Sequence, residues 1–173
     1  MAKFTYRFCP QCGAGLIQRT IMAQVRSACS ACDFVHFEDP KVAVVAFVTC
    51  QGRVLLVQRA VDPEKGKWAM PGGYMDAGEI AEEALQRELL EEVGLEITIE
   101  RLMGTRILYY TNADGDKENV GVVLAYQAFP RSGDLETLSS QDDVMNAGWF
   151  LPNETPDDLA FELTAELLAE WNT

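Results

Sequence analysis

Residues 73–95 have the sequence GYMDAGEIAEEALQRELLEEVGL, in which acids recur with helical spacing. Glu88, Glu91 and Glu92 stand at positions i, i+3 and i+4, so their carboxylates share one face of a helix. Three like charges placed in this way repel one another and weaken an isolated helix, unless a cation lies among them. Carboxylate oxygens are hard ligands, so this face predicts a site for Mg²⁺ or Mn²⁺ and not for zinc.

The same segment predicts a helix with defined ends. Asp76 and Glu79 resemble a capping box before the helix, and Gly94 suits the left-handed position after its last turn. Arg87 follows Glu83 and Glu79 at helical spacing, so it can pair with either acid. An apolar stripe, which would pack on a core, consists of Ala81, Ala84, Leu85, Leu89 and Val93.

A tight loop, Pro71-Gly72-Gly73, comes directly before the helix. Glycine lets the backbone approach a ligand closely, so this loop can offer a carbonyl oxygen to a metal ion. Trp68 stands next to the loop, and anchoring the loop in the core is favoured over stacking on a ligand. Loop and helix together therefore predict one metal site.

The order Gly73, five residues, Glu79, seven residues, then RELLEEVGL over residues 87–95 resembles the complete Nudix box. In the Nudix family this loop–helix–loop binds Mg²⁺ and hydrolyses a nucleoside diphosphate linked to another group. The resemblance implies that Arg87 positions other groups in catalysis, with Glu79 as its partner or as an outer ligand. Glu91 and Glu92 belong to the implied catalytic residues. The implied metal ligands are the carbonyl of Gly72 and the carboxylates of Glu88, Glu91 and Glu92.

Residues 1–38 are predicted to form a unit separate from residues 39–173. Two CxxC pairs separated by sixteen residues lie in this first unit: Cys9 and Cys12, and Cys29 and Cys32. Their spacing predicts a structural zinc site with four thiolate ligands. Two disulfides are the alternative, which fits poorly with a chain that shows no export signal. His36 is expected on the surface, and Cys50 is expected to fill the core.

The order of ribbon, strand and box resembles the Nudix branch in which an N-terminal zinc ribbon precedes the catalytic domain. This branch includes NADH and FAD pyrophosphatases and enzymes like ADP-ribose pyrophosphatase. Ribbon-bearing relatives carry an acid ahead of a Trp-Phe strand, and Asp142-Asp143 occupy that place here. Asp143 is therefore the expected general base, and Glu118 is the second choice. A glutamate of the box is a third possibility. We also hypothesise that Arg106 contacts a phosphate group of the substrate.

The second unit predicts an α/β fold. Strands are expected over residues 41–50, 53–59, 120–129 and 147–151, with one or two more within 96–111. A last helix is expected to start at Thr155–Asp158, where a proline and two acids occupy the first turn. Strands flanked by two helices make a sandwich, and the resemblance implies an α/β/α sandwich with a mixed sheet.

Composition limits the range of partners. The chain of 173 residues has 27 acids and 14 bases, a net charge of −13, which disfavours nucleic acids and anionic membranes. The longest apolar run, Val42–Val48, is too short to cross a bilayer, and no signal peptide is visible. A cytoplasmic location and a small-molecule partner are therefore expected. The resemblance is also compatible with a homodimer.

The expected function is Mg²⁺-dependent hydrolysis of a diphosphate bond in FAD, ADP-ribose, NADH or a nucleotide sugar, with release of a nucleoside monophosphate. Residues 103–122 lack the motif rich in Ser, Gln, Pro and Trp that NADH pyrophosphatases carry, which lowers NADH among these substrates. One alternative is a nucleotide sensor without catalysis, although the intact box speaks against it. Another is a nucleic-acid adaptor, for which the two arginines between the cysteine pairs, Arg19 and Arg26, offer little charge.

Overall fold

A computed structural model describes residues 6–111, 117–135, 138–141 and 143–171, with backbone alone for residues 110, 111 and 117–120. The chain divides into two compact units, Met1–Pro40 and Lys41–Thr173. The predicted division after residue 38 lies two residues before this point. Among the described residues, no helix is long and apolar enough to span a membrane.

The first unit is built on a hairpin of β1 (Leu16–Ile21) and β2 (Gln24–Cys29). A third, short segment runs beside β2, because Ala28 forms an antiparallel bridge with Val35. His36 N–H donates to the Ser27 carbonyl at 2.8 Å in the same ladder. The described part of the unit is therefore a two-stranded sheet with one short segment bridged to β2.

The second unit contains one mixed sheet with the strand order β5-β4-β3-β7-β6, and β8 pairs with β4. Strands β3 and β7 are parallel, whereas the other strand pairs are antiparallel. Their bounds are β3 Lys41–Cys50, β4 Arg53–Arg59, β5 Trp68–Ala69, β6 Ile97–Thr111, β7 Lys117–Pro130 and β8 Val144–Phe150. Strand β6 lies at the sheet edge, and its pairing with β7 shifts register at three places, one of them at the predicted break, Gly104.

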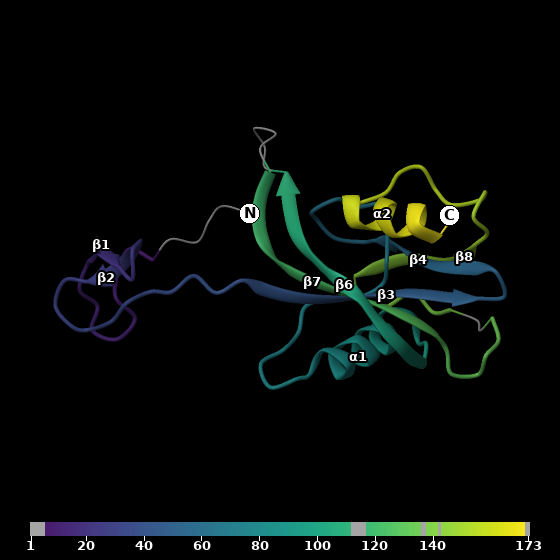
Figure 1. Ribbon diagram of the computed structural model, residues 1–173, viewed down its shortest axis with the longest axis horizontal. Helices are drawn as coiled ribbons and strands as arrows, with labels where there is room; N and C mark the ends of the chain where they lie inside the picture. The colour runs from purple at the N-terminus through teal and green to yellow at the C-terminus, as the bar shows by residue number, and fades with distance from the viewer. Residues whose placement is uncertain (1–5, 112–116, 136–137, 142, 172–173) are drawn as a thin grey trace. The chain divides into compact units, whose positions relative to one another are not determined.

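Helices α1 (Ala81–Val93) and α2 (Glu162–Trp171) cover opposite faces of this sheet (Figure 1). The core under α1 includes Leu85 and Leu89, and the core under α2 includes Leu167. Leu85, Leu89 and Leu167 are all fully buried, and for Leu85 and Leu89 this agrees with the predicted apolar stripe. The predicted α/β/α sandwich with a mixed sheet is thus confirmed.

The sheet is split between β3 and β4, which pair only through two residue pairs beside their hairpin turn. Along the rest of its length on that side, β3 is bonded to residues 71–75. The N–H groups of Val44 and Ala46 donate to the carbonyls of Gly73 and Pro71, each at 2.9 Å. The glycine loop is therefore held as an extended segment against a buried strand.

Two helix starts differ from the sequence prediction. Helix α1 begins at Ala81, and its N-cap residue, Ile80, has no side-chain cap. Asp76 and Glu79 instead close a turn before the helix, where the Asp76 N–H donates to the Glu79 carboxylate at 2.9 Å. Helix α2 begins at Glu162 and not near Thr155, because residues 158–160 are bonded to Trp68 of β5.

Candidate active site

The glycine loop reaches the α1 carboxylates because neither Gly72 nor Gly73 carries a side chain. Gly72 has φ +138°, and a Cβ there would overlap the carbonyl oxygen of Val44 in β3. A Cβ on Gly73 would lie 2.5 Å from the carboxylate of Glu88. The loop is thus clamped between β3 and α1, where any larger residue would force one of them to move.

Glu92 is the most buried acid of the site, with 5% of its surface exposed. Its Oε2 accepts a hydrogen bond from the Gly72 N–H at 2.9 Å. Burial raises the pKa of Glu92 well above its usual range, and the charges of Asp143 and Glu88 act in the same direction. The Gly72 hydrogen bond and the Arg59 charge lower the pKa, but burial outweighs them.

Glu88 and Glu91 extend this acidic face towards solvent. The Glu88 side chain is 15% exposed, whereas that of Glu91 is 49% exposed. Burial raises the pKa of Glu88, and the hydrogen bond from Arg87 opposes this rise. Two acids with raised pKa values on one helix face form a site whose ionised state is costly without a cation. Oxygen donors of this kind fit Mg²⁺ or Mn²⁺.

Arg87 joins the turn before α1 to the acidic face. Its Nε and Nη2 donate to the two carboxylate oxygens of Glu79, at 2.7 and 2.9 Å. Its Nη1 donates to Glu88 at 2.9 Å and to Glu91 at 3.0 Å. The hydrogen bonds from Arg87 lower the pKa of Glu79 to about 2. Glu79 is therefore the acid with which Arg87 makes a two-point contact.

Asp143 approaches the same cluster from the start of β8. Its carbonyl accepts a hydrogen bond from the Ala60 N–H at 2.6 Å, which ties this loop to the end of β4. The negative charge of Asp143 contributes to the raised pKa values of both Glu88 and Glu92. Asp142 and the Glu118 side chain lie outside the described residues. Among the described candidates, the structure thus brings Asp143 to the box.

Arg59 is a site residue that sequence reasoning missed, since it was considered only as part of a strand. Its positive charge lowers the pKa of Glu92. Its Nε donates to the Pro63 carbonyl at 2.9 Å, and its guanidinium carbon lies 5.1 Å from the ring centre of Phe161. An arginine at the end of a strand is common, so no local pattern distinguished it. Only the fold brings it near Glu92.

Several other residues have structural roles. Arg106 pairs with Glu166 and Glu170 of α2, at 3.5 and 3.3 Å, so acids of that helix already balance its charge. Trp68 packs edge-to-face on Phe150, which agrees with an anchoring role. Cys50 is buried, as expected for a core residue, and burial raises the pKa of its thiol.

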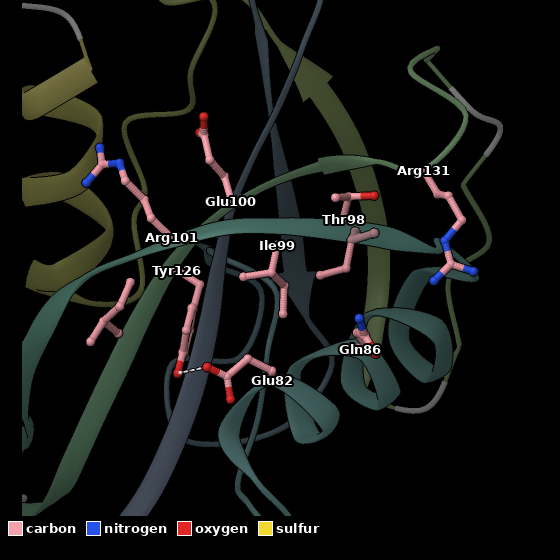
Figure 2. Close-up of a pocket in the computed structure, with 10 residues that line it drawn as sticks. Glu82, Gln86, Thr98, Ile99, Glu100, Arg101, Tyr126 and Arg131 are labelled. Carbon is pink, nitrogen blue, oxygen red and sulfur yellow. Dashed lines mark hydrogen bonds between the residues drawn. The ribbon is translucent and has the colours of Figure 1, made fainter.

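A groove of about 510 Å³ lies between α1 and β6, on the flank of α1 opposite the acidic face. Figure 2 shows Tyr126 of β7 and Glu82 of α1 pointing toward each other at this groove. Their hydrogen bond measures 3.2 Å, and burial raises the pKa of Tyr126.

In the first unit, Cys9, Cys12, Cys29 and Cys32 are positioned to bind a metal ion. Their sulfur atoms all lie within 4.8 Å of one another, and no disulfide joins them. The Cys9–Cys32 and Cys12–Cys29 separations are 3.7 and 3.5 Å. Tetrahedral Zn–S bonds of about 2.3 Å place sulfur atoms roughly 3.8 Å apart. A hydrogen bond from the Ala31 N–H lowers the pKa of Cys29 to about 6, whereas the pKa of Cys32 is raised to about 12.

Comparisons with known proteins agree with this geometry. The family model of the NUDIX domain matches residues 39–171. The ADP-ribose pyrophosphatase of Methanocaldococcus jannaschii is 33% identical over 123 residues, which cover 71% of this chain and 68% of that protein. The crystal structure of a NUDIX hydrolase from Nitrosomonas europaea has a TM-score of 0.79 and 27% identity, and covers 96% of this chain and 91% of that one.

The NAD-capped RNA hydrolase NudC of Vibrio vulnificus is 26% identical over 152 residues, which cover 88% of this chain. The match covers 53% of that relative, so this chain corresponds to about half of its length.

Proposed function

This chain belongs to the Nudix family of hydrolases, and from that premise we propose that Glu88, Glu91, Glu92 and the Gly72 carbonyl hold divalent metal at its catalytic site. Bound Mg²⁺ or Mn²⁺ supplies an acidified water and neutralises charge on a diphosphate. The observation that carries the proposal is the burial of Glu92 against the Gly72 N–H, with raised pKa values for Glu92 and Glu88.

The loop geometry supports a ligand role for Gly72. The carbonyls of Pro71 and Gly73 face β3, where they accept hydrogen bonds from Ala46 and Val44. Carbonyls alternate in direction along an extended chain, so the Gly72 carbonyl is turned away from β3, towards the side of Glu92.

Asp143 is proposed as the general base that accepts a proton from the attacking water. The effect of its charge on the pKa values of Glu88 and Glu92 supports this role. Arg87 holds Glu79, Glu88 and Glu91 in one arrangement, so it acts as a positioning residue. Arg59 is proposed to balance anionic charge at the rim of the site.

The proposed reaction is hydrolysis of a nucleoside diphosphate derivative to a nucleoside monophosphate. ADP-ribose is the first substrate to test, because a relative at 33% identity is named an ADP-ribose pyrophosphatase. FAD, NADH and nucleotide sugars follow. NAD-capped RNA is a second candidate, because the NudC relative of Vibrio vulnificus matches over 88% of this chain. A structural zinc ion at the four cysteines, a homodimer and a cytoplasmic location belong to the same proposal.

A product assay with purified protein and Mg²⁺ tests the proposal. Each substrate is offered to the wild type, to Glu92→Gln and to the control Glu83→Gln, which alters an exposed acid of the same helix. We expect a nucleoside monophosphate from at least one substrate, a loss of about 100-fold or more in kcat for Glu92→Gln, and no change for Glu83→Gln.

The variant Asp143→Asn tests the general base, and a fall of only a few-fold in kcat would remove that assignment. If every substrate binds and none is cleaved with either metal, the sensor alternative replaces the enzyme.

A further inference from the structure

The hairpin of the first unit carries three side chains in one row across its strands. Arg19 of β1 lies directly opposite Arg26 of β2. The Ala28–Val35 bridge and the bond from His36 to Ser27 continue the ladder, which sets Phe37 beside Arg26. Cross-strand neighbours point to the same face, so the row is Arg19, Arg26 and Phe37. Two residues along, Ile17 lies on that face too, and we refer to these four residues as the arginine face.

The two arginines of this face have no acid partner among the described residues. Like charges directly opposite each other destabilise a strand pair, so the arrangement is costly for the hairpin alone. Arg26 donates from Nη2 to Gln24 at 2.8 Å, and its Nε is buried without an acceptor. In the second unit, five bases pair with glutamates, namely Arg53, Lys67, Arg87, Arg106 and Arg131.

Aromatic and apolar surface accompanies these charges. Phe37 and Ile17 are each 44% exposed, although both are large and apolar. The Arg26 guanidinium carbon lies 4.6 Å from the centre of the Phe37 ring, which holds the cation on the ring face. The arginine face therefore combines two uncompensated cations with an exposed aromatic ring.

Charge is distributed unevenly between the two units. Residues 1–40 contain four bases and three acids, a net charge of +1, and the remaining ten bases and 24 acids give residues 41–173 a net charge of −14. The expectation that nucleic acid is disfavoured was based on the total charge of the chain and on the small number of bases, Arg19 and Arg26, between the cysteine pairs. Because nearly all of that charge lies in the second unit, the total does not describe the first.

We propose that the arginine face binds single-stranded nucleic acid, with Arg19 and Arg26 on phosphate groups and Phe37 against a base. Phosphates satisfy both guanidinium groups, and a flat base matches the exposed ring. A peptide of acidic residues alone, such as polyglutamate, would satisfy the arginines but has no flat ring to place against Phe37. This binding goes beyond the proposed hydrolysis, since it requires neither Mg²⁺ nor the carboxylate cluster.

Fluorescence anisotropy with the zinc-loaded full chain and a labelled single-stranded RNA of about 12 nucleotides tests the proposal. The measurement is made without Mg²⁺, so that failure of hydrolysis and failure of binding remain separate results. We expect Arg19→Gln/Arg26→Gln to weaken binding about 10-fold at low salt and to reduce the slope of log K against log salt by about 1.4. Phe37→Leu is expected to weaken binding about 5-fold or more, without altering that slope.

The matched control is Arg53→Gln/Arg131→Gln, which removes two positive charges from the second unit and is expected to leave RNA affinity unchanged. Zinc content and circular dichroism verify that each variant is folded. The proposal is overturned if the wild type does not bind RNA at low salt, or if both double variants weaken binding equally. It is also overturned if polyglutamate competes as well as polyuridylate, or if the arginine variant only dissociates a dimer in light scattering.

Discussion

At the scale of single residues, Glu92 shows a conflict between stability and function. Its carboxylate is buried, and burial raises its pKa. Because the pKa of Glu92 is higher in the native protein than in the unfolded chain, its contribution to the free energy of unfolding is fully present below the unfolded pKa, near 4.3. This contribution is lost as pH rises towards the native pKa. Without divalent metal, ionisation of Glu92 in the native state is therefore expected to lower the free energy of unfolding as pH rises.

Glu92→Gln is expected to unfold at a higher temperature than the wild type in buffer free of Mg²⁺ and Mn²⁺. The difference in Tm should grow between about pH 5 and pH 8, because glutamine does not ionise. Added Mn²⁺ should stabilise the wild type and have little effect on the variant. Differential scanning fluorimetry across this pH range measures both effects. A wild type that is more stable than the variant at pH 8 without metal would contradict the account.

Sequence spacing alone placed the acids of the box on one helix face and placed Gly94 after the last turn. Gly94 has φ +70°, and its N–H bonds back to the Leu90 carbonyl at 3.0 Å. Local patterns predict such features because the helix repeat determines them. Arg59 was not predictable in this way, since its effect on Glu92 arises from strands brought together by the fold.

At the scale of elements, the split between β3 and β4 gives the glycine loop a strand partner. The Val44 carbonyl lies where a Gly72 Cβ would be, so the loop fits only without a side chain at this position. Helix starts were predicted less well, because both rested on local capping signals. Contacts formed by the fold determine both starts instead. The Glu79 carboxylate accepts hydrogen bonds from Arg87, and residues 158–160 are bonded to Trp68 of β5.

Gly72→Ala is expected to lower the free energy of unfolding by about 3 kcal/mol or more, because the added Cβ would clash with backbone atoms of Val44 and Val45 in β3. The control is Gly133→Ala, where φ is +77° but no atom lies within 4 Å of the added Cβ. That variant should lose only about 1 kcal/mol, from backbone strain alone. Urea denaturation of both proteins provides the comparison. Equal losses would show that strain, and not the close approach to β3, makes glycine necessary at position 72.

At the scale of the whole molecule, the two units have separate sources of stability. The second unit has extensive apolar cores on both faces of its sheet, whereas the first is organised around four cysteines. Spacing predicted the cysteine cluster because two CxxC pairs restrict where the sulfur atoms lie. The structure divides the chain after Pro40, two residues beyond the predicted boundary at residue 38. The grouping of Arg19, Arg26, Phe37 and Ile17 on one face was not predictable, because it depends on strand register.

Cys9→Ser/Cys32→Ser is expected to abolish zinc binding and to remove amide protection from β1 and β2 in hydrogen exchange. The second unit should keep its own unfolding transition within a few degrees. Cys50→Ala is the control, because it changes a buried cysteine of the second unit and should retain one zinc ion per chain. Metal analysis and calorimetry measure these outcomes. Loss of both transitions in the double variant would mean that the second unit depends on zinc.

Strand β6 has a consequence for association between copies. Fifteen residues long and at the edge of the sheet, it exposes Leu102 and Ile107. A straight strand of this kind would be a template for edge-to-edge polymerisation. Its three register shifts against β7 twist the strand and interrupt the outward row of amides and carbonyls. These irregularities act as a built-in obstacle to fibre growth, so engineering that straightens β6 would also favour aggregation.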